Sequence, residues 1–177
     1  MAVVTVFGGS HVKEGEPEYQ IARELGKWLA GAGHTLCNGG QGGVMEASAR
    51  GAKESSGKTI GVTAEELGSN VNRWIDEQIV VPKWRDRLFK LIEIGDTYII
   101  FDGATGTLAE LFVVWEMANK KYIQKPFIIF GRQMQDWVRQ IQKSPQILNP
   151  TNLFFAKTMD EIIKVLKEKV HADASRF

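Results

Sequence analysis

The sequence has little cysteine and little histidine, and both shortages exclude kinds of chemistry. Cys37 is the only cysteine among the 177 residues, which excludes an intrachain disulfide and a zinc site of four cysteines. The three histidines, His11, His34 and His171, are far apart in the sequence, which argues against a metal-centred function. We therefore expect no metal site.

Long apolar runs and a charge of one sign are also missing. No apolar stretch approaches the roughly 18 residues that a membrane-spanning helix needs. No basic segment precedes the short apolar run at the N-terminus, as a signal peptide would require. The 22 Lys and Arg residues nearly balance the 21 Asp and Glu residues, whereas nucleic-acid binders usually carry a large basic excess. We expect a cytoplasmic protein with no membrane or nucleic-acid partner.

Length and composition are otherwise those of an ordinary globular protein. A chain of 177 residues favours one domain over residues 1–177, and it is long enough to form a stable core. Apolar residues make up 44% and charged residues 24%, so disorder is not expected as the main state. Glycine is the exception, because 18 of the 177 residues are glycine, a larger share than the roughly 7% of an average protein. These glycines fall in clusters.

Short apolar runs alternate with segments whose apolar residues recur at helical spacing. Strands are predicted at 2–7, 34–37, 58–62, 97–101, 126–130 and 153–156, with a further candidate at 78–81. Helices are predicted at 17–31, 44–54, 84–92, 108–122 and 134–142, and after a capping-box pattern at 158–161. Residues 63–77 and 170–177 carry no clear signal. Continuous apolar strands alternating with helices are typical of an α/β fold with a mostly parallel sheet and helices on both faces.

Three glycine clusters, at 8–9, 39–43 and 103–106, directly follow predicted strands. Ligands of open parallel sheets bind at the carboxyl ends of the strands, so we expect the clusters to converge on one crevice. Four of the five residues at 39–43 are glycine, more than a tight turn needs. Free N–H groups at the start of the following helix favour an anion, typically phosphate. The segment matches neither the Walker A nor the dinucleotide motif.

The loop at 102–110 supports the same argument for an anion, but its glutamate has two interpretations. Thr107 and Glu110 have capping-box spacing, so Glu110 either caps the helix or takes part in catalysis. Its helix is apolar on both faces and must be covered on both sides, which indicates a homodimer contact and a partly dry setting for Glu110.

Other candidates are equally open. Arg87 either lies in a solvated charged turn or binds phosphate or sugar oxygens through its guanidinium. The segment Gly8-Gly9-Ser10 forms a plain turn or contacts a base or ribose. Within 63–77, the side chains of Asn72, Arg73 and Asp76 are candidates for a base pocket.

Three segments taken together resemble a known family. They are FGGS at 7–10, GGQGGVMEA at 39–47 and DGATGTLAE at 102–110, with Arg87 fifteen residues before Asp102. They are similar to the Lonely Guy family of cytokinin-activating phosphoribohydrolases, many of which carry the older label lysine decarboxylase-like. The resemblance covers about residues 3–130, and its most specific motif is Pro-Gly-Gly-x-Gly-Thr-x-x-Glu. Molybdenum-cofactor carrier proteins share the fold and similar loops.

The resemblance implies a Rossmann-like fold, a homodimer or higher homo-oligomer, and cleavage of an AMP-like nucleoside 5′-monophosphate into free base and ribose 5-phosphate. No cofactor is implied. The family's catalytic arginine falls on Arg87 and its catalytic glutamate on Glu110. The residues assigned to substrate and phosphate binding are Gly8, Gly9, Ser10, Gly39, Gly40, Gly42, Gly43, Met45, Gly103, Ala104, Thr105, Gly106 and Thr107.

The chain departs from the family motif at two positions of the loop. Asp102 replaces the proline and Ala104 replaces the second glycine. A carboxylate at Asp102 is expected to weaken phosphate binding by like-charge repulsion unless it points away. These departures keep open an alternative, a non-catalytic protein that binds a nucleotide or the molybdenum cofactor. Lysine decarboxylation is not expected, because no lysine lies in a recognisable pyridoxal phosphate site.

Overall fold

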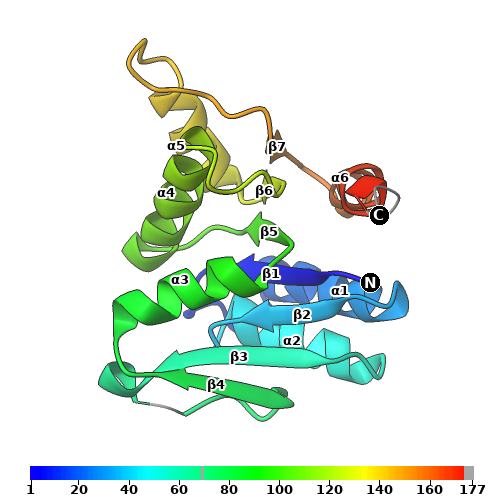
Figure 1. Ribbon diagram of the computed structural model, residues 1–177. Helices are drawn as coiled ribbons and strands as arrows, with labels where there is room; N and C mark the ends of the chain where they lie inside the picture. Colours follow the sequence, from blue (N-terminus) through cyan, green and yellow to red (C-terminus); the bar gives the residue numbers. More distant parts are fainter. Residues whose placement is uncertain (69, 174–177) are drawn as a thin grey trace.

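The computed structural model describes residues 1–68 and 70–173, which form a sheet of parallel strands covered by helices (Figure 1). The strands are β1 Val3–Phe7, β2 Thr35–Asn38, β3 Thr59–Ala64, β4 Glu77–Val81, β5 Thr97–Ile100, β6 Phe127–Ile129 and β7 Leu153–Phe155. The helices are α1 Pro17–Gly31, α2 Val44–Glu54, α3 Trp84–Ile94, α4 Thr105–Asn119, α5 Arg132–Ile141 and α6 Met159–Asp173, with a short 3-10 helix η1 at Glu65–Leu67.

The strand order, β4-β3-β2-β1-β5-β6-β7, fixes where a ligand is expected. All neighbouring strands are parallel, and in the register Thr5 of β1 lies opposite Cys37 of β2 on one side and Tyr98 of β5 on the other. The chain moves outward from β1 to β4, then returns to β5 beside β1 and moves outward in the other direction. The strand order therefore reverses between β1 and β5, at whose carboxyl ends open α/β sheets bind their ligands.

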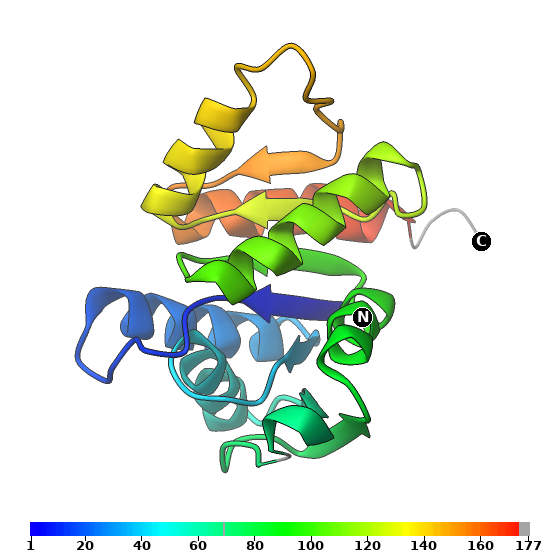
Figure 2. The same cartoon turned by 90° about the vertical axis from the view of Figure 1, so that its left-hand side faces the viewer.

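The helices form two layers, one on each face of the sheet. Helices α1, α2 and α6 cover one face, and α3, α4 and α5 cover the other, as Figure 2 shows with α4 in front of the sheet and α1 and α6 behind it. Within β1, Val4 and Val6 pack against the first layer, and Phe7 packs against the second. Because both faces are covered, the strand is apolar except for Thr5, whose buried hydroxyl donates to the carbonyl oxygen of Leu91. The predicted Rossmann-like α/β fold is confirmed.

The differences from the sequence prediction lie at element boundaries. The first turn of α4 begins at 105, three residues before the predicted start, and that helix ends at 119. Helix α5 covers 132–141 instead of 134–142. The candidate strand at 78–81 is β4, and η1 lies in the preceding polar segment. Helix α6 continues to Asp173, so residues 170–173, for which the sequence carries no clear signal, are helical, and 174–177 lie outside the described residues. Within the described part, no helix is long and apolar enough to cross a membrane.

Candidate functional site

Gly9 links the three glycine loops at the carboxyl ends of the strands. Its N–H donates to the carbonyl oxygen of Asp102 at 2.8 Å, and its own carbonyl oxygen accepts from the N–H of Val44 at 2.9 Å. The loops after β1 and β5 are thereby joined to each other and to the start of α2. The expected convergence of the glycine clusters occurs where the strand order reverses.

Two of the glycines allow this close approach. Gly43 has a φ of 64°, and a Cβ atom there would collide with the carbonyl oxygen of Gly9. A Cβ atom at Gly103 would collide with the hydroxyl of Thr107. Gly106 differs, because a Cβ atom there would meet no protein atom within 4 Å. Packing within the chain therefore does not explain Gly106, which leaves open space beside the first turn of α4.

A cleft of about 170 Å³ lies between these loops. That volume is far more than the roughly 10–15 Å³ that one water molecule needs. The predicted site residues that line it are Gly8, Gly9, Ser10, Gly39, Met45, Arg87, Ala104, Gly106, Thr107 and Glu110. The remaining predicted residues, Gly40, Gly42, Gly43, Gly103 and Thr105, are not among the residues that line it. Gly40 has a structural role, since its N–H donates to the Asn38 side chain at 2.8 Å.

Arg87 projects from α3 into the floor of the cleft, and its side chain is buried. Its Nε donates to the carbonyl oxygen of Val62 at 2.9 Å, which fixes the guanidinium. A Cβ atom at Gly39 would collide with Nη2 of Arg87, so glycine is required there to make room for the arginine. Burial lowers the pKa of Arg87, and the nearby charge of Glu110 opposes that shift.

Glu110 lies opposite Arg87, with its Oε1 3.6 Å from Nη1 of the arginine. The N-cap of α4 is Ala104, so Thr107 and Glu110 both lie inside the helix and the capping-box interpretation is wrong. Only 13% of the Glu110 side chain is exposed. Burial raises the pKa of Glu110 to about 7, although the charge of Arg87 acts to lower it. The cleft thus contains a carboxyl group that changes its charge near neutral pH.

The two departures in the loop after β5 do not disturb its geometry. The Asp102 carboxylate accepts hydrogen bonds from the backbone N–H of Met134 at 2.7 Å and of Gln133 at 3.2 Å. It therefore caps the start of α5. Asp102 is not among the residues that line the cleft. Ala104 has a φ of −90°, an ordinary value for any residue, so the position does not need glycine.

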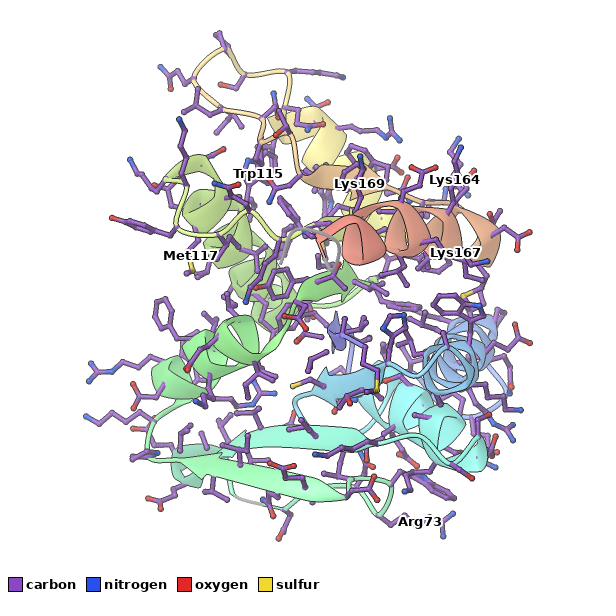
Figure 3. All side chains as sticks on the ribbon, turned by 45° about the vertical axis from the view of Figure 1, so that its right-hand side comes forward. Arg73, Trp115, Met117, Lys164, Lys167 and Lys169 are labelled. Carbon is purple, nitrogen blue, oxygen red and sulfur yellow. The ribbon has the colours of Figure 1, made fainter. Side chains whose placement is uncertain are left out.

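The segment at 63–77 contributes differently from the expectation. Asn72 donates to the backbone oxygens of Gly40 and Gln41, and Asp76 accepts from Thr59, so both hold neighbouring backbone in place. Arg73 stacks on the Trp74 ring at 4.6 Å and projects from the outer edge of the molecule (Figure 3). The assignment of Asn72, Arg73 and Asp76 to a base pocket is wrong, since none lines the cleft.

Sequence reasoning missed six residues that line the cleft: Val6, Phe7, His11, Gln41, Leu67 and Trp84. Leu67 and Trp84 lie on η1 and at the start of α3, which the fold brings together. A signal was available in Trp84, which lies three residues before Arg87 on a predicted helix and so shares its face. Across residues 1–68 and 70–173, no three His, Cys, Asp or Glu side chains are grouped so that they could hold a metal ion.

Comparison with known proteins gives the family. The model of the SLOG cluster4 family matches residues 1–163. The chain belongs to this family. The cytokinin riboside 5′-monophosphate phosphoribohydrolase of Rhodococcoides fascians is 29% identical over 132 residues, 72% of this chain and 67% of that protein. The resemblance inferred from the three motifs is confirmed.

Two further proteins are similar to this chain, one in sequence and one in structure. The pyrimidine/purine nucleotide 5′-monophosphate nucleosidase of Escherichia coli is 28% identical over 155 residues, 80% of this chain but 34% of that enzyme. The chain therefore spans about a third of the length of that relative. The molybdenum cofactor binding protein of Rippkaea orientalis is 24% identical, with a TM-score of 0.75 over 94% of this chain and 96% of that one. At this identity the likeness shows the fold alone.

Proposed function

We propose that this SLOG cluster4 protein is a nucleoside 5′-monophosphate phosphoribohydrolase, which releases the free base and ribose 5-phosphate. The observation that carries the proposal is the Arg87–Glu110 pair that lines the cleft, in which Arg87 is buried and only 13% of the Glu110 side chain is exposed. A site that only binds phosphate needs neither a buried carboxyl group nor its guanidinium partner. Hydrolysis of an N-glycosidic bond uses both.

The start of α4 supplies the phosphate site in this proposal. The first N–H groups of a helix have no partner within the helix, and no side chain caps this one. Gly106 leaves open space beside these N–H groups, so an anion can approach the backbone closely. The helix dipole adds a favourable field for a phosphate monoester.

Glu110 and Arg87 then act on the ribose. Arg87 binds ribose or phosphate oxygens and turns the anomeric carbon toward Glu110. Cleavage passes through an oxocarbenium-like state, which the Glu110 carboxylate stabilises. The C1′–N bond breaks and the water oxygen bonds to C1′, while Glu110 accepts a proton from the water; the leaving base takes up a proton from solvent, and Glu110 returns its own to solvent.

The direct test is release of ribose 5-phosphate from a panel of AMP, GMP, CMP, UMP and isopentenyl-AMP. We expect release from at least one of the five at a rate proportional to enzyme concentration. If the purified protein binds these nucleotides and releases ribose 5-phosphate from none of them, the proposal is wrong.

The second candidate is a non-catalytic protein that binds a nucleotide or the molybdenum cofactor. The departures at Asp102 and Ala104 from the family motif favour it. The orientation of the Asp102 carboxylate, which caps α5, weakens the argument from charge repulsion. Tight binding of a nucleotide or a pterin with no turnover across the panel is the result that this candidate predicts.

The assembly that we propose is a homodimer, or a higher homo-oligomer built from it, formed through the outer face of α4. Phe112 on this face is 41% exposed, and its ring stacks against that of Trp115 with centroids 6.3 Å apart. Met117 lies further along the same helix (Figure 3) and is half-buried. An apolar outer face on a helix that already packs on the sheet favours a protein contact.

A further inference from the structure

The mouth of the cleft has an apolar part that the proposed chemistry leaves unused. Trp84 and Leu67 line the cleft, yet 41% of Trp84 and 49% of Leu67 is exposed. Among the large apolar side chains that are exposed in the described residues, only these two line it. Val6, Phe7 and Met45 also line the cleft and are themselves buried.

The two exposed side chains are held beside the reacting groups. The backbone N–H of Trp84 donates to the Glu66 carboxylate at 3.0 Å, which ties the start of α3 to η1, where Leu67 lies. Trp84 also precedes Arg87 by three residues on α3, so both side chains lie on one face of that helix. The apolar pair therefore adjoins the Arg87–Glu110 centre.

From this placement we infer that Trp84, together with Leu67, is the platform on which the base of the nucleotide stacks. The inference rests on the proposed function. With the phosphate at the start of α4 and the anomeric carbon at Glu110, the base is the part of the substrate left to occupy the remaining end of the cleft. An indole ring stacks on heteroaromatic rings, and a two-ring purine covers more of it than a pyrimidine. A purine nucleotide therefore gains more affinity from the platform than a pyrimidine nucleotide does.

Equilibrium binding of AMP, UMP and ribose 5-phosphate tests the platform. We expect Trp84→Ala to weaken AMP binding by about tenfold or more, since stacking of a base on an aromatic ring commonly contributes that much. UMP binding falls less, and ribose 5-phosphate, which has no base, binds within twofold of wild type. Trp84→Phe retains most of the AMP affinity. The matched control is Trp137→Ala, which removes a tryptophan of similar exposure (38%) on α5 and leaves all three affinities unchanged.

Equal weakening of AMP and ribose 5-phosphate by Trp84→Ala overturns the inference, because Trp84 then supports the fold or the phosphate site. Unchanged affinity for all three ligands overturns it as well. Binding needs no turnover, so these outcomes are separate from the proposed function, whose failure appears as bound nucleotide without release of ribose 5-phosphate. Sedimentation of Trp84→Ala serves as a check: loss of subunit association together with parallel loss of all affinities assigns Trp84 to an interface and contradicts the platform.

Discussion

At the scale of single residues, the charge of Glu110 connects structure with function. Burial raises its pKa to about 7, and the proposed mechanism needs its ionised form. Below pH 7 the carboxyl group is protonated and cannot stabilise the developing cation or accept a proton. Above pH 7 it is ionised and competent.

The expected result is a kcat/KM that rises with pH along an acid limb with an apparent pKa near 7, measured by release of ribose 5-phosphate from AMP. The Arg87 charge lowers the pKa of Glu110, so Arg87→Met moves any residual activity to higher pH. An acid limb with the apparent pKa of an ordinary exposed glutamate, about 4.3, would contradict the assignment.

Sequence reasoning at this scale identified Arg87 and Glu110 but not Trp84 or Leu67. The first two were predicted from the resemblance to the Lonely Guy family, whose motifs can be read along the chain. Trp84 shares the helix face of Arg87 and could have been predicted, whereas Leu67 reaches the cleft where η1 meets α3, two elements that the Glu66–Trp84 hydrogen bond joins. Local periodicity describes one helix at a time and contains no information about such a contact.

At the scale of elements, the first turn of α4 contains a glycine, Gly106, that packing within the chain does not explain. A Cβ atom at Gly106 meets no protein atom within 4 Å, and alanine is favoured over glycine in a helix by up to about 1 kcal/mol. Gly106→Ala is therefore expected to raise the free energy of unfolding slightly. It is also expected to weaken binding of AMP and ribose 5-phosphate about tenfold, because the methyl group occupies the space for phosphate.

The matched control is Gly31→Ala at the end of α1, where a Cβ atom also meets no protein atom within 4 Å. Urea unfolding and calorimetric binding give both quantities for the two variants. Gly31→Ala changes no affinity. If Gly106→Ala binds ribose 5-phosphate as tightly as wild type, the phosphate does not lie at the start of α4.

The sequence predicted the elements well where continuous apolar runs are buried on both faces, as in β1 and β5. It failed at the start of α4, because Thr107 and Glu110 have capping-box spacing but the helix begins two residues before Thr107. Spacing alone cannot distinguish an N-cap from a position inside the first turn. Only the extended backbone of Ala104 fixes the boundary.

At the scale of the whole molecule, strand order explains why loops distant in the sequence meet. The glycine clusters at 8–9 and 103–106 are adjacent because β1 and β5 pair in parallel. The alternation of strands and helices along the sequence does not specify that these two strands are neighbours. The single domain over residues 1–177 remains a prediction, and a single cooperative unfolding transition is its expected signature.

Association of the whole molecule is expected to depend on the outer face of α4. Phe112→Glu places a charge in the proposed contact and is expected to convert a dimer into a monomer, as measured by sedimentation equilibrium. Val80→Glu is the control, because Val80 is similarly exposed (45%) on the edge strand β4. A wild-type monomer, or a Phe112→Glu variant that stays dimeric, contradicts this interface.

The most direct test of the proposed function compares wild type with Glu110→Gln, which keeps the size of the side chain and removes its charge. Both proteins are assayed for AMP binding and for release of ribose 5-phosphate from AMP. The proposal predicts release by wild type, a rate at least about 100-fold lower for the variant, and AMP affinities within a few-fold of each other. Equal rates for the two proteins, or bound AMP with no release by wild type, would contradict it.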